Sequence, residues 1–164
     1  TGVSDNMRQV YVQDISGTEN AGIMVYFGTD NTLSVSVGDS VTVTGEVSEF
    51  TSAGSSRTNI DIANAADLQV TGTGAVSPVE ITSDPTDWEV YEGMLVTITT
   101  ATVSSDVDQY GVSTLDEYSI SLDSTLYDYV GDVASGTTYT SVTGIVDDYF
   151  GYTLLPRSAS DIVE

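Results

Sequence analysis

Apolar and polar residues alternate along most of the chain, which is the pattern of half-buried β-strands. Valine, isoleucine, threonine and tyrosine are frequent in these segments, and all four residue types favour extended backbone. Clusters of glycine, asparagine, aspartate and serine separate the segments, as turns require. The sequence therefore predicts an all-β fold, either a barrel or a sandwich. The strand-like segments read QVYVQD, GIMVYFG, SVTVTGEVSEF, TNIDIA, MLVTITTATV, YSISLD, YTSVTGIV and YTLLP.

Helix-like periodicity is limited to two short stretches, IANAADLQV and TDWEVYEG. Each stretch predicts a single short turn rather than a helix that packs on a sheet. In the second stretch, Pro85 suits the first position of the turn, and Asp84 and Asp87 are placed to cap it.

The chain also carries an internal repeat. The segment from Val41 to Phe50, VTVTGEVSEF, matches the segment from Thr140 to Phe150, TSVTGIVDDYF, when Gly45 is aligned with Gly144. In both copies an acidic residue and then an aromatic residue follow the shared glycine strand. Further along, AADL in the first copy matches ASDI in the second. We therefore expect two copies of one small β unit in tandem.

The repeat predicts two modules, residues 1–72 and 73–164, joined by a glycine-rich linker. Each copy has room for roughly five strands, which suits the five-stranded Greek-key barrel called the OB-fold. Gly45 and Gly144 would then permit a bulge or sharp bend at a barrel corner. An immunoglobulin-like sandwich is the alternative, but it needs about seven strands per domain.

Several segments carry a family resemblance. VYVQD, GIMVYFG and LSVSVGDSVTVTGEVSEF in the first copy, and WEVYEGMLVTI in the second, resemble the OB-fold modules found beside bacterial secreted nucleases of the endonuclease/exonuclease/phosphatase type. Similar modules stand in cell-surface proteins. The resemblance implies tandem OB-like barrels, an extracellular location and nucleic-acid binding. It does not extend to catalysis, because the nuclease motifs are absent from this sequence.

The first copy departs from that pattern at its front. The second copy opens with the strand GMLVTITTATV, whereas only TGVSDNM, from Thr1 to Met7, precedes the first strand-like segment of the first copy. The sequence therefore predicts a first barrel that lacks its first strand. Two explanations stay open, namely a truncated chain or a strand supplied by another chain. In the second case, the exposed edge would serve strand addition from a neighbouring copy.

Charge narrows the possible functions. The chain holds 25 acidic residues against three arginines, with no lysine or histidine, for a formal charge of −22. Such a surface repels phosphate backbones, anionic lipids and other copies of itself, and it attracts cations. A solubility surface without any ligand is the alternative interpretation. No apolar run of 18 residues is present, so we expect no membrane partner.

Catalysis is poorly supported by the residue types. The sequence has no cysteine and no histidine, which removes thiol chemistry, zinc–thiolate sites and the commonest general base. It has no Gly-x-Ser-x-Gly motif and no phosphate-binding loop that ends in lysine. Close pairs of carboxylates occur next to predicted turns, where acidic residues are ordinary. We expect a protein that is not an enzyme and holds no organic cofactor.

Calcium is the ligand that fits the composition best, because Ca²⁺ takes six to eight oxygen ligands. No EF-hand loop is present, so a site would combine several acidic loops. Asp106 and Asp108 would share one face of a strand or converge in a turn, whereas Asp147 and Asp148 would need a bend to share an ion. For each loop the alternative is a solvated turn acid. The candidate ligands are Asp14, Glu19, Asp30, Asp84, Asp87, Asp106, Asp108, Asp147 and Asp148.

These observations lead to two main functional predictions. The first is a non-catalytic extracellular structural protein that forms a fibre or surface layer through strand edges, with Ca²⁺ neutralising its carboxylates. The second is a nucleic-acid-binding accessory module of a secreted nuclease system, which would need cation bridging against the acidic charge. Its stacking residues would be Tyr11, Tyr26, Tyr149 and Tyr152, although tyrosines on strands also serve ordinary packing. A third possibility is an acidic domain that has no ligand.

Overall fold

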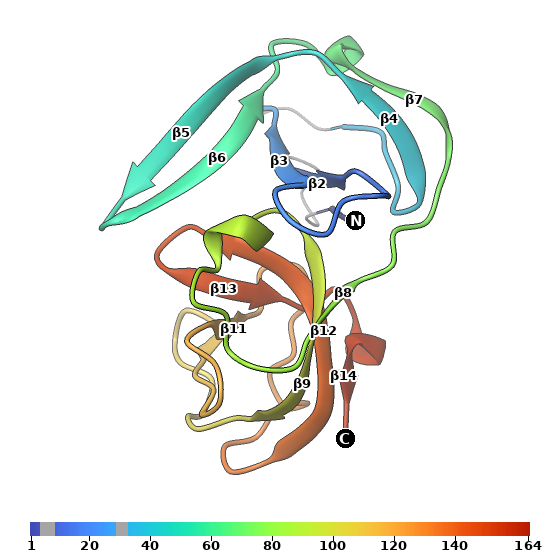
Figure 1. Ribbon diagram of the computed structural model, residues 1–164. Coiled ribbons are helices and arrows are strands. Elements are labelled where there is room, and N and C mark those ends of the chain that lie inside the picture. The colour runs from blue at the N-terminus through green and yellow to red at the C-terminus, as the bar shows by residue number, and fades with distance from the viewer. Residues whose placement is uncertain (4–8, 29–32) are drawn as a thin grey trace.

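The computed structural model describes residues 1–3, 9–28 and 33–164, and Figure 1 shows its arrangement. The described residues form an all-β fold without any α-helix, so the predicted fold class is confirmed. Three short 3₁₀ turns complete the regular structure, namely η1 (Ala65–Asp67), η2 (Glu89–Tyr91) and η3 (Ala159–Asp161). Within the described ranges, no helix has the length and apolar character needed to cross a bilayer.

The strands form three sheets. The first sheet has the order β1-β2-β3-β6-β5, and the two-stranded sheet β4-β7 lies beside it. The third sheet has the order β10-β11-β13-β12-β9-β8, and β14 also pairs with β12. The bounds are β1 (Gly2–Val3), β2 (Gln9–Gln13), β3 (Gly22–Tyr26), β4 (Asp39–Val43), β5 (Glu46–Ser52), β6 (Ser55–Asp61), β7 (Leu68–Thr73), β8 (Val79–Ile81), β9 (Leu95–Thr102), β10 (Val112–Ser113), β11 (Ser121–Asp123), β12 (Thr138–Asp148), β13 (Tyr152–Leu155) and β14 (Ile162–Val163).

None of the three sheets closes on itself, so the finer prediction of two closed five-stranded barrels is not confirmed. In the third sheet, one isolated bridge between Val103 and Leu115 spans the gap between β9 and the segment after β10. In the first half of the chain, β4 pairs only with β7 among the described strands. Closure needs a continuous ladder on both sides of the first strand, and neither half provides one.

The two halves nevertheless share one order of pairing. Strands β3 and β6 are parallel neighbours in the first half, and β11 and β13 are parallel neighbours in the second. A short 3₁₀ turn and a strand then return to pair with β4 in the first half and with β12 in the second. The registers also agree, since Val43 faces Leu68 in the first half and its counterpart Val142 faces Ile162 in the second.

Three apolar clusters hold these sheets together. The first half buries one cluster that includes Val25, Phe27 and Leu33. The second half buries a cluster around β9 and β12 that contains Trp88 and Tyr129. A third cluster joins strands of both halves, so the first and third sheets share buried apolar surface. Its members are Tyr11, Met24, Leu95, Leu126, Ile145 and Leu155.

The repeated glycines serve close approach between strands. A Cβ at Gly144 would lie 2.8 Å from the backbone carbon of Leu155, on the paired strand β13. A Cβ at Gly45 would lie 2.5 Å from the carbonyl oxygen of Asp61. Gly45 falls in the interval between β4 and β5, as expected for a bend, whereas β12 continues through Gly144 without interruption. Both positions therefore require a residue without a side chain, but the strand is interrupted at this glycine only in the first copy.

The two predicted turns are present as η1 and η2, but the capping of η2 differs from the prediction. Asp87 accepts a hydrogen bond from the backbone N–H of Glu89 at the start of η2. Asp84 does not cap this turn. It accepts hydrogen bonds from Trp88 Nε1 and from the backbone N–H of Ser119, so it ties the turn to a distant loop. Ser119 lies 35 positions from Asp84 in the sequence, so the spacing of residues around the turn could not predict this contact.

Candidate functional site

Among the described strands β4 pairs only with β7, and its uncovered second edge is the clearest difference between the two halves. In the second half, β9 covers the corresponding edge of β12 along seven residue pairs, from Thr138–Thr102 to Ile145–Leu95. In the first half, the only described strand in that place is β1, which pairs with β2 through Gly2 and Val3. The space between β1–β2 and β4 is therefore the place that β9 fills in the second copy. We call this space the β4 lane.

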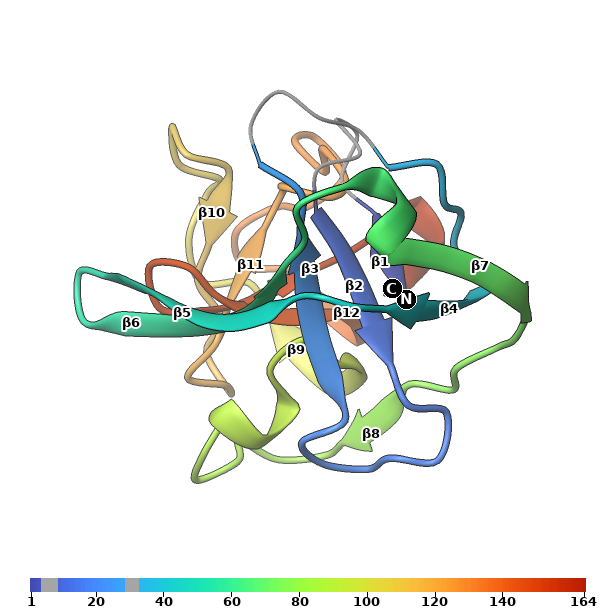
Figure 2. The same cartoon turned by 90° about the horizontal axis from the view of Figure 1, so that it is seen from above.

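The β4 lane is a groove of about 710 Å³. Its walls are β1 and β2 on one side and β4 with the segment before it on the other, and Figure 2 shows β4 and β7 standing beside β1 and β2. Valines dominate the apolar part of the lining. They are Val3, Val10, Val12, Val35, Val37, Val41, Val43 and Val76.

Burial confirms that the two copies differ at this place. Val142 on β12 is fully buried under β9, with 0% exposure. Its counterpart Val43 on β4 is only partly buried and packs at the margin of the first-half cluster. Val37, in the segment that leads into β4, is 59% exposed. An added strand would cover these side chains, as β9 does in the other copy.

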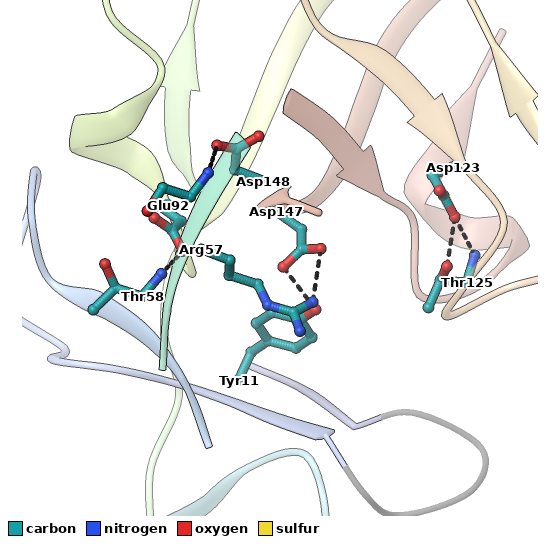
Figure 3. Close-up of polar contacts among 9 residues, drawn as sticks. Tyr11, Arg57, Thr58, Glu92, Asp123, Thr125, Asp147 and Asp148 are labelled. Atoms are coloured by element: carbon teal, nitrogen blue, oxygen red, sulfur yellow. Dashed lines mark hydrogen bonds and ion pairs between the residues drawn. The ribbon is translucent and has the colours of Figure 1, made fainter. Parts of the chain in front are cut away.

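A buried ionic cluster lies where the two halves meet. Arg57 on β6 and Asp147 on β12 are 6% and 4% exposed, and Nη1 of Arg57 lies 3.3 Å from Oδ2 of Asp147. The hydroxyl of Tyr11 on β2 donates to the other carboxylate oxygen at 3.1 Å (Figure 3). Burial raises the pKa of Asp147, and the Arg57 guanidinium opposes that rise. Burial and the nearby Asp147 charge likewise raise the pKa of Tyr11 well above its ordinary value.

Two further carboxylates bind the edge of β6. Asp148 accepts a hydrogen bond from the backbone N–H of Ser56 at 2.9 Å, and Glu92 accepts one from the N–H of Thr58 at 2.8 Å (Figure 3). Both acids belong to the second half, and both amides belong to the first. This edge of β6 is therefore occupied by side chains, whereas the β4 edge is open. Unpaired edge amides invite strand addition, and these carboxylates block it here.

Glu92 yields a testable prediction on stability. Desolvation raises its pKa from 4.5 to about 8, although the Thr58 N–H opposes the shift. The folded state therefore holds a proton that the unfolded state releases above pH 4.5, so stability falls as the pH rises towards 8. Glu92→Gln keeps an acceptor for Thr58 and removes the charge. Because Glu92 is only half-buried, we expect the variant to be more stable by about 1 kcal/mol at pH 8, after allowance for solvent screening.

Thermal unfolding of both proteins between about pH 5 and about pH 8.5 measures this effect. The stability difference should be small at the acidic end and grow towards the alkaline end. Glu80→Gln, at an exposed position on β8, is the matched control and should show no such trend. A constant difference across the range would contradict the assignment.

The predicted metal ligands do not converge in the described residues. Asp147 and Asp148 are buried and hold the contacts described above. Among the described ranges, no group of three or more acidic side chains is placed to hold an ion. Asp14 accepts from Ser16, and Asp108 accepts from Tyr110 and Val112, as local turn acids do. Glu19 and Asp106 are exposed, and Asp30 lies outside the described residues. Calcium binding stays a prediction.

The four tyrosines that were predicted to stack on nucleic-acid bases lie in different environments. Tyr11 is 1% exposed and bonds Asp147, so its ring faces the interior. Tyr26 packs partly buried against the cluster that joins the two halves. The Tyr152 hydroxyl donates to Glu89 at 2.8 Å. Only Tyr149, which is 42% exposed, presents a large ring surface. Nucleic-acid binding likewise stays a prediction.

Sequence reasoning missed Arg57 and Phe50 as site residues. The ring of Phe50 stacks on Tyr149 with centroids 5.3 Å apart, and the Arg57 guanidinium lies 5.0 Å from the Tyr149 ring. Phe50 and Tyr149 are the aromatic residues that follow the acid in each copy of the repeat. Their equivalent positions were therefore a usable signal. No spacing rule would have paired Arg57 with an acid 90 positions away.

Comparison with known proteins supplies no family. No protein-family model matches the chain, and neither the curated proteins nor the solved structures yield a significant match. The functional argument therefore depends on the residues and their geometry.

Proposed function

We propose that this protein is a non-catalytic, extracellular structural subunit that associates with further copies of itself by strand addition in the β4 lane. The observation that carries the proposal is the difference between the two copies of the repeat. An edge covered by β9 in the second half is open in the first, above a groove rich in valine. Free strand edges of this kind add strands from neighbouring chains.

We interpret each half as an OB-like barrel, the first with an incomplete first strand. The parallel pairs β3–β6 and β11–β13, together with the bridge from Val103 to Leu115, support this interpretation. In a five-stranded barrel of this type the first strand closes the structure by pairing on both sides. A strand from a neighbouring copy in the β4 lane would complete the first half in the same way.

Association between copies must overcome their charge. At −22, each subunit repels the next, and the repulsion is strongest at low ionic strength. We propose that Ca²⁺ neutralises carboxylates between copies, since hard divalent cations prefer oxygen ligands. A contact between two different surfaces of the subunit propagates as an open filament, whereas a self-complementary contact would stop at a dimer.

Sedimentation velocity and electron microscopy with Ca²⁺, and again after chelation, test this function. We expect ordered assemblies with Ca²⁺ that loosen when it is removed. Val37→Glu places a charge in the β4 lane at an exposed position, so it should prevent assembly without unfolding the protein. Val70→Glu changes another exposed valine, 50% exposed and outside the lane, and should leave assembly intact. Monomers in both conditions at high concentration, or equal assembly of the two variants, would refute the proposal.

A further inference from the structure

A second surface, separate from the β4 lane, has the features of a ligand site. The β5–β6 hairpin projects from the first sheet, on the side opposite β4 and β7 (Figure 2). At its base lies a hollow of about 470 Å³, which is within the usual size range of small-molecule sites. Its walls include Ser48, Glu49, Phe50, Asn59, Asp61 and Tyr149. We call this hollow the aromatic hollow.

One wall of the aromatic hollow consists of stacked rings. Phe50 and Tyr149 stack at 5.3 Å with an interplanar angle of 17°, and Phe150 meets Tyr149 edge to face at 4.4 Å. Phe50 and Tyr149 are each 42% exposed and Phe150 is 64% exposed, and none of the three belongs to an apolar core cluster. Exposed aromatic surface of this kind marks an interaction site. The Arg57 guanidinium lies 5.7 Å from the Phe50 ring and helps to fix these stacked rings, which we call the platform.

The remaining wall of the hollow is polar and ordered by its own hydrogen bonds. Asn59 is 4% exposed, and its Nδ2 donates to Ser48 Oγ at 2.7 Å and to Asp61 Oδ1 at 2.9 Å. These two donations fix the orientation of the amide. Its Oδ1 is buried and accepts no hydrogen bond from the described part of the chain. Leaving a buried acceptor unpaired is unfavourable, so a ligand hydroxyl that reaches this oxygen, once the side chains that cover it shift, would bind favourably.

A carboxylate extends the same wall, since Asp61 accepts from Ser48 and Asn59. Glu49 projects from the other face of the hairpin, where it accepts from Ser56 and Thr58. A carboxylate has about four lone-pair positions, so Asp61 retains capacity for further donors. The wall therefore offers mainly acceptors, which suits a ligand that carries several hydroxyl groups.

Charge decides between classes of ligand. The net charge of −22 and the local carboxylates repel phosphate, which disfavours nucleic acid. Arg57 already lies over both rings and is paired with Asp147, so a cationic ligand would meet a like charge at the platform. A neutral ligand encounters neither obstacle. Flat sugar rings stack on aromatic faces and donate hydroxyl hydrogen bonds to carboxylates and amides.

We infer that the aromatic hollow binds a neutral carbohydrate chain, with a sugar ring on Phe50 and Tyr149 and hydroxyl groups on Asn59 and Asp61. The site is independent of the proposed assembly through the β4 lane. A subunit in an extracellular layer would thereby gain a contact to neutral polysaccharide.

The experiment titrates the isotopically labelled full chain with neutral hexasaccharides of glucose, mannose and N-acetylglucosamine, with single-stranded oligothymidine as the competing class. Amide shifts in nuclear magnetic resonance should concentrate in residues 48–61 and 147–150 for at least one hexasaccharide. Tyr149→Ala should weaken that binding at least tenfold. Tyr110→Ala changes a ring that is 77% exposed and outside the hollow, so it should have no effect.

Several outcomes would overturn the inference. They are the absence of binding by all three sugars at millimolar concentration, shifts located in the β4 lane instead, unchanged affinity in Tyr149→Ala, or tighter binding of oligothymidine. The direct titration uses the unaltered chain, so the test remains decisive even if Tyr149→Ala does not fold. Assembly of Val37→Glu is measured separately, so the two proposals fail by different observations.

Discussion

Replacing Arg57 by methionine is expected to lower the free energy of unfolding by about 3–5 kcal/mol. The substitution leaves the Asp147 carboxylate in a buried site where, in the described part of the chain, the Tyr11 hydroxyl is its remaining side-chain donor. An ion removed from water and deprived of its partner is among the most destabilising arrangements in a protein interior. Equilibrium unfolding in urea at neutral pH measures the loss.

The matched variant changes both partners. Arg57→Met combined with Asp147→Asn removes both charges and keeps an oxygen that accepts from Tyr11. We expect this double variant to recover most of the lost stability, since neutral replacement of a buried ion pair is often nearly neutral in free energy. Together with Asp147→Asn alone and the unaltered protein, the two variants form a double-mutant cycle. A loss below about 1 kcal/mol in Arg57→Met alone would mean that water reaches Asp147 and that the pair is not sealed.

Gly93→Ala is expected to cost about 3 kcal/mol, because two unfavourable effects combine. The backbone of Gly93 has φ of +71°, which side chains disfavour. The added Cβ would also lie 2.5 Å from the backbone nitrogen of Ile23 and 2.7 Å from the carbonyl carbon of Gly22. Backbone cannot move aside as a flexible side chain does. The clash therefore falls on the contact between β3 and the start of β9, where the two halves touch.

Gly131→Ala separates these two effects. Gly131 has φ of +96°, but a Cβ there would meet nothing within 4 Å. This control should cost only about 1 kcal/mol, the backbone component alone. The difference between the two variants in urea unfolding then measures the close approach of the halves. Equal losses would show that the halves separate slightly without penalty.

Local patterning was sufficient to predict much of this fold. Alternation of valine, threonine and tyrosine predicted the strands, and the aligned Gly45 and Gly144 predicted that both halves would share one order of pairing. These features depend on neighbours in sequence or on comparison between copies. The closed barrels were not confirmed, since closure depends on strands that pair across the whole unit.

The contacts between the halves could not be predicted in this way. Asp147 and Asp148 stand beside a turn and resemble solvated acids or cation ligands in the sequence. Their burial depends on β6, which docks from the other half and brings Arg57 and the N–H of Ser56. No local rule reports that approach. For the aromatic hollow, the equivalent positions of Phe50 and Tyr149 were visible, but not that the two copies would bring these rings together.

The matched positions Val43 and Val142 allow the free energy of one strand pairing to be measured by comparing the two halves of the same molecule. Both residues face the same partner position, Leu68 or Ile162, and they differ in whether a strand covers the other edge. Amide hydrogen exchange along Asp39–Val43 and Thr138–Val142 would therefore compare a covered and an uncovered ladder within one molecule. Temperature, solvent and chain composition are then identical for both, so the ratio of protection factors converts directly into the free energy that the additional strand contributes.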